Sequence, residues 1–151
     1  MLKVKIMPTN VKATLLDNIG FKVNIKEFPE FLMDEPQEFH GNGRGPSAAE
    51  FLLTAIAGCQ GTSFQFCLQK FNIKPEEMVV NVESEMHHVW FEEYERKILI
   101  ITNIHVSIDV KLKNPDDQEN LQECFELFQK FCVVTTSVRR GIPVDVKLNQ
   151  K

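Results

Sequence analysis

Apolar and polar residues alternate along the chain from residue 11 to residue 33, with an interruption at residues 17–20. Such alternation is typical of a β-strand with one buried face, and the interruption contains the turn-forming residues Asp, Asn and Gly. We therefore expect a hairpin of residues 11–16 and 21–27, followed by a short third strand at residues 30–33.

The next part of the chain changes from this alternation to a helical period. Residues 34–46 are rich in Pro and Gly, which predicts a loop without a regular element. Ser47 then stands three residues before Glu50, as in a capping box, and apolar residues recur with a period of 3.6 as far as residue 71. This pattern predicts a helix of about 24 residues, about 36 Å long. Its middle contains Gly58 and Gly61, which allow close contact with another element.

The second half of the chain repeats the change from strand to helix. Residues 79–90 and 96–112 are rich in Val, Ile and Thr and flank an acidic stretch, so they predict a long hairpin. Residues 114–131 again have helical spacing, with acidic residues at the start. Residues 133–140 form a short connecting segment, and residues 144–148 predict a last strand.

The expected order of elements is β-β-β-α-β-β-α-β, which indicates an α+β fold with antiparallel sheets in a single domain over residues 1–151. So few strands do not easily cover the long central helix within one chain. A homodimer in which two such helices pack together would cover it.

Composition and charge narrow the classes of function. The chain has 151 residues and a net charge of −4, without the broad basic field that binds nucleic acid. Its apolar runs are far shorter than the ~20 residues of a membrane span, and residues 1–5 do not resemble the start of a leader. We therefore expect a cytoplasmic protein with no membrane partner, in which four cysteines are reduced and any disulfide is transient.

Two cysteines are the candidates for chemistry. Cys59 lies among small residues on the predicted first helix, and Cys132 lies at the end of the second. Each is either a buried core cysteine, as most free cysteines are, or a reactive thiol. We expect Cys67 and Cys124 to be core residues on the apolar faces of the same two helices.

The other groups of candidate residues give weaker evidence of a functional site. The spacing of the four cysteines does not match the close Cys pairs of a zinc site. His87 and His88 point to opposite faces of a strand, so they are not expected to enter one metal site together. A Cys-His hydrolase stays open as an alternative, although Cys59 lacks the local signatures known for that class. The excess of Phe, 12 residues against one Tyr and one Trp, is interpreted as core, with some available to line an apolar pocket.

The sequence resembles a known family at both candidate cysteines. Residues 45–59, GPSAAEFLLTAIAGC, resemble the GPSPxELLLAALAGC helix of the OsmC/Ohr family. Near the other end, FCVVT at residues 131–135 and GIPVDV at residues 141–146 resemble the YCPVS segment and the closing GVPVxV strand of that family. Order and spacing agree over nearly the whole chain.

This resemblance implies an OsmC-like fold, in which antiparallel sheets surround long central helices in an intertwined homodimer. It also implies a cysteine-based peroxidase that reduces small organic hydroperoxides in oxidative-stress protection. Cys59 would form a sulfenic acid, Cys132 would resolve it to a disulfide, and a dithiol reductant of the lipoyl type or a small thiol would reopen the bond. Such a cycle needs no metal or organic cofactor.

The sequence departs from the family pattern around the thiol. Peroxidases of the family hold the thiolate with an arginine of the N-terminal strands and a glutamate ten residues before the cysteine, whereas these strands contain only lysines and position 49 is Ala. Glu50, nine residues before Cys59, is a candidate catalytic residue through a partner chain, or only part of the helix cap. Arg44 is a candidate to stabilise the thiolate, or an exposed surface residue.

Two further consequences remain open. Arg139 and Arg140 are close to Cys132 in sequence, so they either lower a thiol pKa or form a surface pair. Because Cys59 has no evident activator, the alternative function is a catalytically silent OsmC-like protein that binds a small apolar ligand at the dimer interface.

Overall fold

The computed structural model describes residues 9–150, which divide between Leu52 and Leu53 into two compact units. The start of the chain, on which the expectation about a leader rests, lies outside the described residues. The single domain over residues 1–151 stays a prediction, and each unit is described by itself.

The N-terminal unit contains a three-stranded antiparallel sheet in the order β1-β2-β3. Its strands are β1 (Val11–Asp17), β2 (Gly20–Ile25) and β3 (Phe31–Met33). The turn between β1 and β2 has Asn18 at φ 45°, a left-handed conformation that Asn tolerates better than most residues. The predicted hairpin and third strand are therefore confirmed to within two residues.

Asp34 anchors the loop that follows this sheet. Its side chain is buried, and its carboxylate accepts hydrogen bonds from the backbone N–H groups of Glu35, Asn42 and Arg44. The prediction that this loop contains no regular element was wrong in one place, since residues Gln37–Phe39 form a single 3₁₀ turn. A one-turn element leaves no periodicity in the sequence by which to find it.

The long helix α1 (Ala48–Lys70) begins at the predicted cap. The hydroxyl of Ser47 accepts from the backbone N–H of Glu50 at 3.3 Å, and the Glu50 carboxylate accepts from the backbone N–H of Ser47 at 2.7 Å. This reciprocal pair is a capping box, and it satisfies two backbone donors at the helix start. The helix ends one residue before the predicted limit.

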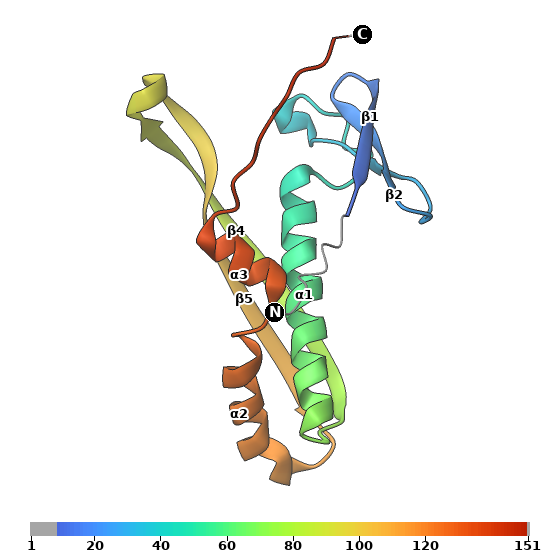
Figure 1. The fold of residues 1–151 in the computed structure, drawn as a ribbon, viewed down its shortest axis with the longest axis vertical. Helices are drawn as coiled ribbons and strands as arrows, with labels where there is room; N and C mark the ends of the chain where they lie inside the picture. The colour runs from blue at the N-terminus through green and yellow to red at the C-terminus, as the bar shows by residue number, and fades with distance from the viewer. Residues whose placement is uncertain (1–8, 151) are drawn as a thin grey trace, which may run out of the picture. The chain divides into compact units, whose positions relative to one another are not determined.

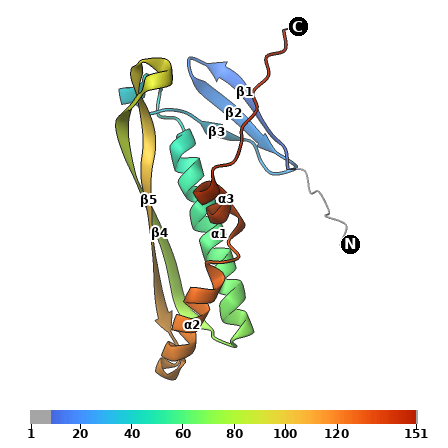
Figure 2. The same cartoon turned by 60° about the vertical axis from the view of Figure 1, so that its left-hand side comes forward.

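The second unit contains most of α1 and a long two-stranded antiparallel hairpin of β4 (Pro75–Phe91) and β5 (Arg96–Leu112). The tip of this hairpin is a 3₁₀ turn at Glu92–Tyr94, where the predicted acidic stretch lies. Figure 2 shows α1 running beside the hairpin and α2 near the lower end of the hairpin. The predicted hairpin is confirmed, and β4 begins four residues earlier than expected.

Two helices follow. A 3₁₀ turn at Pro115–Asp117 leads into α2 (Gln118–Phe128), and α3 (Val133–Arg140) begins directly after Cys132 (Figure 1). Residues 141–150 follow α3 as an extended segment with no strand, so the predicted strand at residues 144–148 is absent from this chain. A strand needs a neighbour for its backbone hydrogen bonds, and this segment has none within the part of the chain that the structure describes.

The core of the second unit lies where α1, α2 and the hairpin meet. Its buried members are Phe64, Cys67, Leu68, Ile73, Cys124 and Phe128. The rings of Phe64 and Phe128 pack with their centroids 4.7 Å apart, and the face of β5 contributes Ile108 and Val110. This core fixes α2, and with it the start of α3, against α1.

Helix α1 is also long and apolar enough to cross a membrane, by length and composition only. Its most apolar window has a mean hydropathy of 1.3, and only 28% of that window is buried within the chain. The central helix of a soluble protein has the same properties, so this feature assigns no membrane. It does leave a long apolar helix partly uncovered.

Candidate functional site

The structure brings the two candidate cysteines into direct contact. The Sγ of Cys132 lies 2.9 Å from the Sγ of Cys59, although the residues are 73 positions apart in the chain. Cys59 is on α1 and is half-buried, whereas Cys132 is fully buried immediately before α3. Both sulfurs are free thiols.

The first turn of α3 points a backbone donor at Cys59. Cys132 is the N-cap residue of α3, and the N–H of Val134, two residues on, donates to the Cys59 Sγ at 3.4 Å. The first N–H groups of a helix have no partner inside the helix, and the helix dipole places partial positive charge there. The Sγ of Cys59 thus accepts from both the Cys132 thiol and a helix N-terminus.

A buried polar chain supports Cys132 from the other side. The Thr135 hydroxyl lies 3.1 Å from the Cys132 Sγ, and the Nε2 of Gln60 donates to the same hydroxyl oxygen at 2.7 Å. Both Gln60 and Thr135 are buried. The Thr135 hydroxyl therefore contacts Cys132 and Gln60 at once and links the thiol pair to a second buried polar side chain.

These contacts favour an ionised sulfur at the pair. Burial opposes a charge on Cys132, but hydrogen bonds with Cys59, Thr135 and Ser63 outweigh it and lower the pKa of the Cys132 thiol below its ordinary value.

A small cavity of about 200 Å³ adjoins the polar chain. Gln60 and Thr135 line it together with apolar side chains of α1, β5 and α2, among them Ile56, Val106 and Phe128. Arg139, on the last turn of α3, also lines this cavity. An apolar molecule with one polar group fits such a lining.

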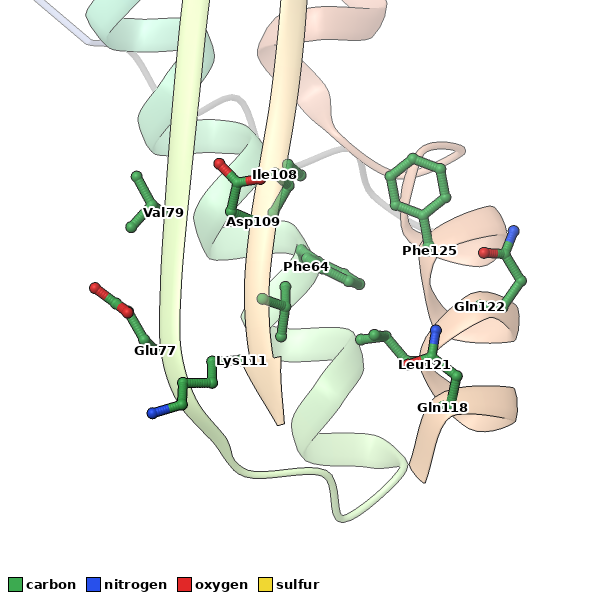
Figure 3. A pocket seen from close by; sticks show the side chains of 11 residues that line it. Phe64, Glu77, Val79, Ile108, Asp109, Lys111, Gln118, Leu121, Gln122 and Phe125 are labelled. Atoms are coloured by element: carbon green, nitrogen blue, oxygen red, sulfur yellow. The ribbon is translucent and has the colours of Figure 1, made fainter. Parts of the chain in front are cut away.

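A larger groove of about 580 Å³ lies between the hairpin and α2. Figure 3 shows Phe64, Leu121 and Phe125 around it from the helices, with Val79 and Asp109 along the strands. It contains no cysteine, and the groups that line it form no nucleophilic or metal-binding set. We therefore place the candidate chemistry at the thiol pair and not in this groove.

The other predicted residues are occupied within the N-terminal unit. The Glu50 carboxylate bonds the backbone and hydroxyl of Ser47, which lower its pKa, so its capping role is confirmed while a catalytic role stays a prediction. The Nε of Arg44 donates to Asp34 at 2.9 Å, and its Nη1 donates to Asp17 at 2.9 Å. Arg44 thus bridges two carboxylates, and its assignment to a thiolate also stays a prediction.

The remaining candidates take no part in the contact between Cys59 and Cys132. Cys67 and Cys124 are buried in the core, as expected. The Nδ1 of His87 lies 2.7 Å from the hydroxyl of Thr102 on the neighbouring strand. Within residues 9–150, no group of three or more His, Cys, Asp or Glu side chains could hold a metal ion.

Sequence reasoning missed Gln60, Val134 and Thr135. It treated residues 133–140 as a connection, although Arg139 and Arg140 followed by Gly141 are a common helix ending. Taking that signal into account would have placed Cys132 at the start of a helix. The N–H groups of the first turn of that helix would then be expected near the Cys132 thiol.

Comparison with known proteins shows the family of the chain and the likeness of its fold. Residues 41–147 match the family model described as OsmC-like protein. No curated protein matches the sequence significantly.

Among solved structures, an OsmC-like protein from Mycoplasma pneumoniae is 14% identical, with a TM-score of 0.71 over 88% of each chain. An organic hydroperoxide resistance protein OsmC from Legionella pneumophila is 15% identical, with a TM-score of 0.65 over 88% of this chain and 90% of that chain. An organic hydroperoxide resistance protein from Elizabethkingia anophelis is 14% identical, with a TM-score of 0.65 over 90% and 91% of the two chains. At these identities the likeness concerns the fold.

Proposed function

Because the chain belongs to the OsmC-like family, we propose that it is a thiol-dependent peroxidase that reduces organic hydroperoxides with Cys59 and Cys132. Proteins of the OsmC/Ohr family are generally dimeric and act on hydroperoxides. The observation that carries the proposal is the 2.9 Å contact between the two sulfurs, because a two-cysteine cycle requires the thiols to meet.

The proposed cycle assigns attack to Cys59, because it is the less buried of the two sulfurs. The Cys59 thiolate attacks the terminal peroxide oxygen, an S–O bond forms, the O–O bond breaks, and the alkoxide leaves as an alcohol after taking a proton. The sulfur of Cys132 then attacks the sulfenic acid, so that an S–S bond forms and water leaves. A dithiol reductant reopens the disulfide.

The N-terminus of α3 is proposed to replace the arginine that the N-terminal strands lack. The N–H of Val134 and the Cys132 thiol both donate to the Cys59 Sγ, so two hydrogen-bond donors stabilise a negative sulfur there. Gln60 and Thr135 act as positioning residues, since they hold Cys132 in place through a buried hydrogen-bond chain.

The substrate is proposed to be a hydroperoxide with an apolar body. The cavity of about 200 Å³ beside Thr135 has mainly apolar walls, and Arg139 in its lining would favour a substrate that also carries an anionic group. This cavity is too small for a bulky substrate to bury fully, so such a substrate would extend outside it.

A homodimer is proposed because the chain leaves apolar surface uncovered. On the helices and in the turn between α2 and α3, Phe66, Phe131 and Val133 are 59%, 69% and 73% exposed. Beyond α3, the alternating apolar residues of the C-terminal segment are 61–95% exposed: Ile142, Val144, Val146 and Leu148. A second copy that supplies a neighbouring strand would bury this segment and account for the strand pattern at residues 144–148.

A turnover assay tests the proposed activity. Consumption of cumene hydroperoxide in the presence of dihydrolipoamide or dithiothreitol should be rapid with the parent protein and lost in Cys59→Ser. Cys67→Ser serves as the matched control, because it removes a thiol from the same helix without touching the proposed pair. Equal rates in the parent and Cys59→Ser would contradict the proposal and favour the alternative of a silent, ligand-binding member of the fold.

A further inference from the structure

A second pair of cysteines lies in the core between the same two chain segments. Cys67 on α1 and Cys124 on α2 are 5% and 0% exposed and belong to the central apolar cluster. Each stands eight residues from one member of the first pair, Cys67 after Cys59 and Cys124 before Cys132. The proposed peroxidase cycle uses neither of them.

The two residues are in direct contact. The Cys67 Sγ donates to the backbone carbonyl oxygen of Cys124 at 3.5 Å. This contact brings the two buried cysteines together on packed helices, and closeness of the two residues is the first requirement of a disulfide.

An apolar cavity leads to Cys67. It has a volume of about 440 Å³, and its walls include Phe66, Leu127, Phe128 and Phe131 beside Cys67. The Nζ of Lys70, also in the lining, lies 4.7 Å from the centre of the Phe66 ring. Such walls favour an apolar oxidant over a small hydrophilic one.

We propose that Cys67 and Cys124 are a second oxidisable dithiol, which an apolar organic hydroperoxide converts into a disulfide that joins α1 to α2. The oxidant belongs to the same chemical class as the proposed substrate, but the reaction needs neither Cys59 nor Cys132. The site therefore stands independently of the proposed peroxidase cycle.

The reaction balances in two steps. The Cys67 sulfur attacks the peroxide oxygen, so that an S–O bond forms, the O–O bond breaks and the alcohol leaves with the thiol proton. The Cys124 sulfur then attacks the Cys67 sulfenic acid, an S–S bond forms, and water carries away the remaining hydroxyl and the Cys124 proton. Two thiols are oxidised and one hydroperoxide is reduced.

This second pair should react more slowly than the first. Burial, together with the neighbouring Cys67, raises the pKa of the Cys124 thiol to about 12, so Cys124 is protonated at neutral pH. A protonated sulfur is a poor nucleophile, which delays disulfide formation. Oxidation should thus occur in two phases, with the α1–α2 bond closing only under excess peroxide.

The test uses the reduced full-length variant Cys59→Ser/Cys132→Ser, treated with excess cumene hydroperoxide. We expect the loss of two thiols, a mass decrease of two hydrogen atoms, and a linked peptide that contains Cys67 and Cys124 after digestion without reductant. The matched control adds Cys124→Ala, which should stop at a sulfenic acid on Cys67 that dimedone traps. Full retention of both thiols in the first variant, or a disulfide between two chains instead, would overturn the proposal.

The parent protein provides a second measurement that does not depend on the folding of the variants. Under excess cumene hydroperoxide, two thiols should disappear quickly and two more slowly, and the Cys67–Cys124 peptide should accumulate only in the slow phase. A slow phase that gives only higher oxides of Cys59 would overturn the proposal. If the fast phase alone is missing, the peroxidase proposal fails and the second dithiol stands.

Discussion

The Sγ of Cys59 accepts a hydrogen bond from the backbone N–H of Val134, the second residue of α3. This contact places the thiol at the N-terminus of a helix, where unpaired N–H groups and the helix dipole favour negative charge. The chain lacks the strand arginine that its family uses for this purpose, so a backbone group now has the corresponding role in our proposal.

Replacement of Val134 by Pro tests that role, because it removes the N–H without removing a hydrogen bond inside the helix. A hydrogen bond to a charged group contributes about 1.5 kcal/mol or more, so the reaction rate of Cys59 with peroxide should fall on the order of tenfold. Stopped-flow measurement of thiol loss gives this rate.

The control is Val133→Pro, which places proline at the first helical position after the extended residue Cys132, where it is tolerated. Melting curves of both variants show whether α3 is intact. If both variants react at the parent rate and remain folded, the helix N-terminus does not activate Cys59.

The hydroxyl of Thr135 can be removed with little change of shape by Thr135→Val. This leaves the buried Nε2 of Gln60 without its acceptor, so the free energy of unfolding should fall by about 1–3 kcal/mol. It also removes the hydroxyl that holds the Cys132 Sγ in place, so disulfide formation should slow while sulfenic acid formation at Cys59 persists. Denaturant unfolding and dimedone trapping measure the two effects.

The double variant Gln60→Leu/Thr135→Val separates stability from chemistry. Removal of both polar groups should restore much of the lost stability, whereas disulfide formation should stay slow. Thr135→Ser keeps the hydroxyl and serves as the control. Parent-like disulfide formation in Thr135→Val would refute the positioning role.

The Cys124 thiol should make stability fall at high pH. Its pKa is about 12 in the folded protein and about 9 when unfolded, so the unfolded chain releases this proton first. The stability that the protonated, buried form contributes is present below pH 9 and is lost as pH rises toward 12. Denaturant unfolding between pH 8 and pH 11 should therefore show a steeper decline in the parent than in Cys124→Ala. Parallel curves would be inconsistent with the raised pKa.

Arg44 is expected to stabilise the N-terminal unit through Asp17 and Asp34. The hydrogen bond from the Arg44 side chain is the main cause that lowers the pKa of Asp34 in the folded protein. The Asp34 carboxylate therefore stabilises the fold above the unfolded pKa of Asp, which is about 4. This stabilisation is lost as the pH falls through the lower pKa of the folded state. Arg44→Ala should lower the melting temperature near neutral pH. It should also make the melting temperature change less as the pH falls into the acid range. Arg44→Lys should recover only part of the lost stability, because lysine lacks the planar guanidinium group with several N–H donors.

Peroxide reactivity provides the second readout for Arg44→Ala. Since its guanidinium is engaged by two carboxylates, the rate at Cys59 should stay at the parent value in the folded variant. A large loss of rate without loss of structure would restore Arg44 as a thiolate-stabilising residue.

The sequence predicts most of the fold because its local signals agree with one another. The capping box at Ser47 and Glu50 marks the start of α1 to within one residue, and alternation marks both hairpins. Helix α3 was missed because residues 133–140 include Val and Thr, which favour strands in isolation. Packing of the segment after Cys132 overrides that preference.

The last predicted strand, in contrast to α3, is indicated by the sequence but absent from the structure of this chain. Residues 144–148 have the alternation of a strand, yet a strand also needs a partner outside its own sequence. Only part of the candidate site can be predicted from the sequence. The family motifs identify Cys59 and Cys132. The contact between them and the support from Gln60 and Thr135 depend on packing between residues some 75 positions apart. No local pattern reports such a contact.

The most direct test is a single turnover of the reduced protein with one equivalent of cumene hydroperoxide, followed by intact mass and thiol titration. We predict rapid loss of two thiols and two hydrogen atoms in the parent, a sulfenic acid trapped on Cys59 in Cys132→Ser, and no fast reaction in Cys59→Ser. Survival of all four thiols for minutes, or a fast disulfide that forms without Cys59, would contradict the assignment of this pair as the peroxide-reducing centre.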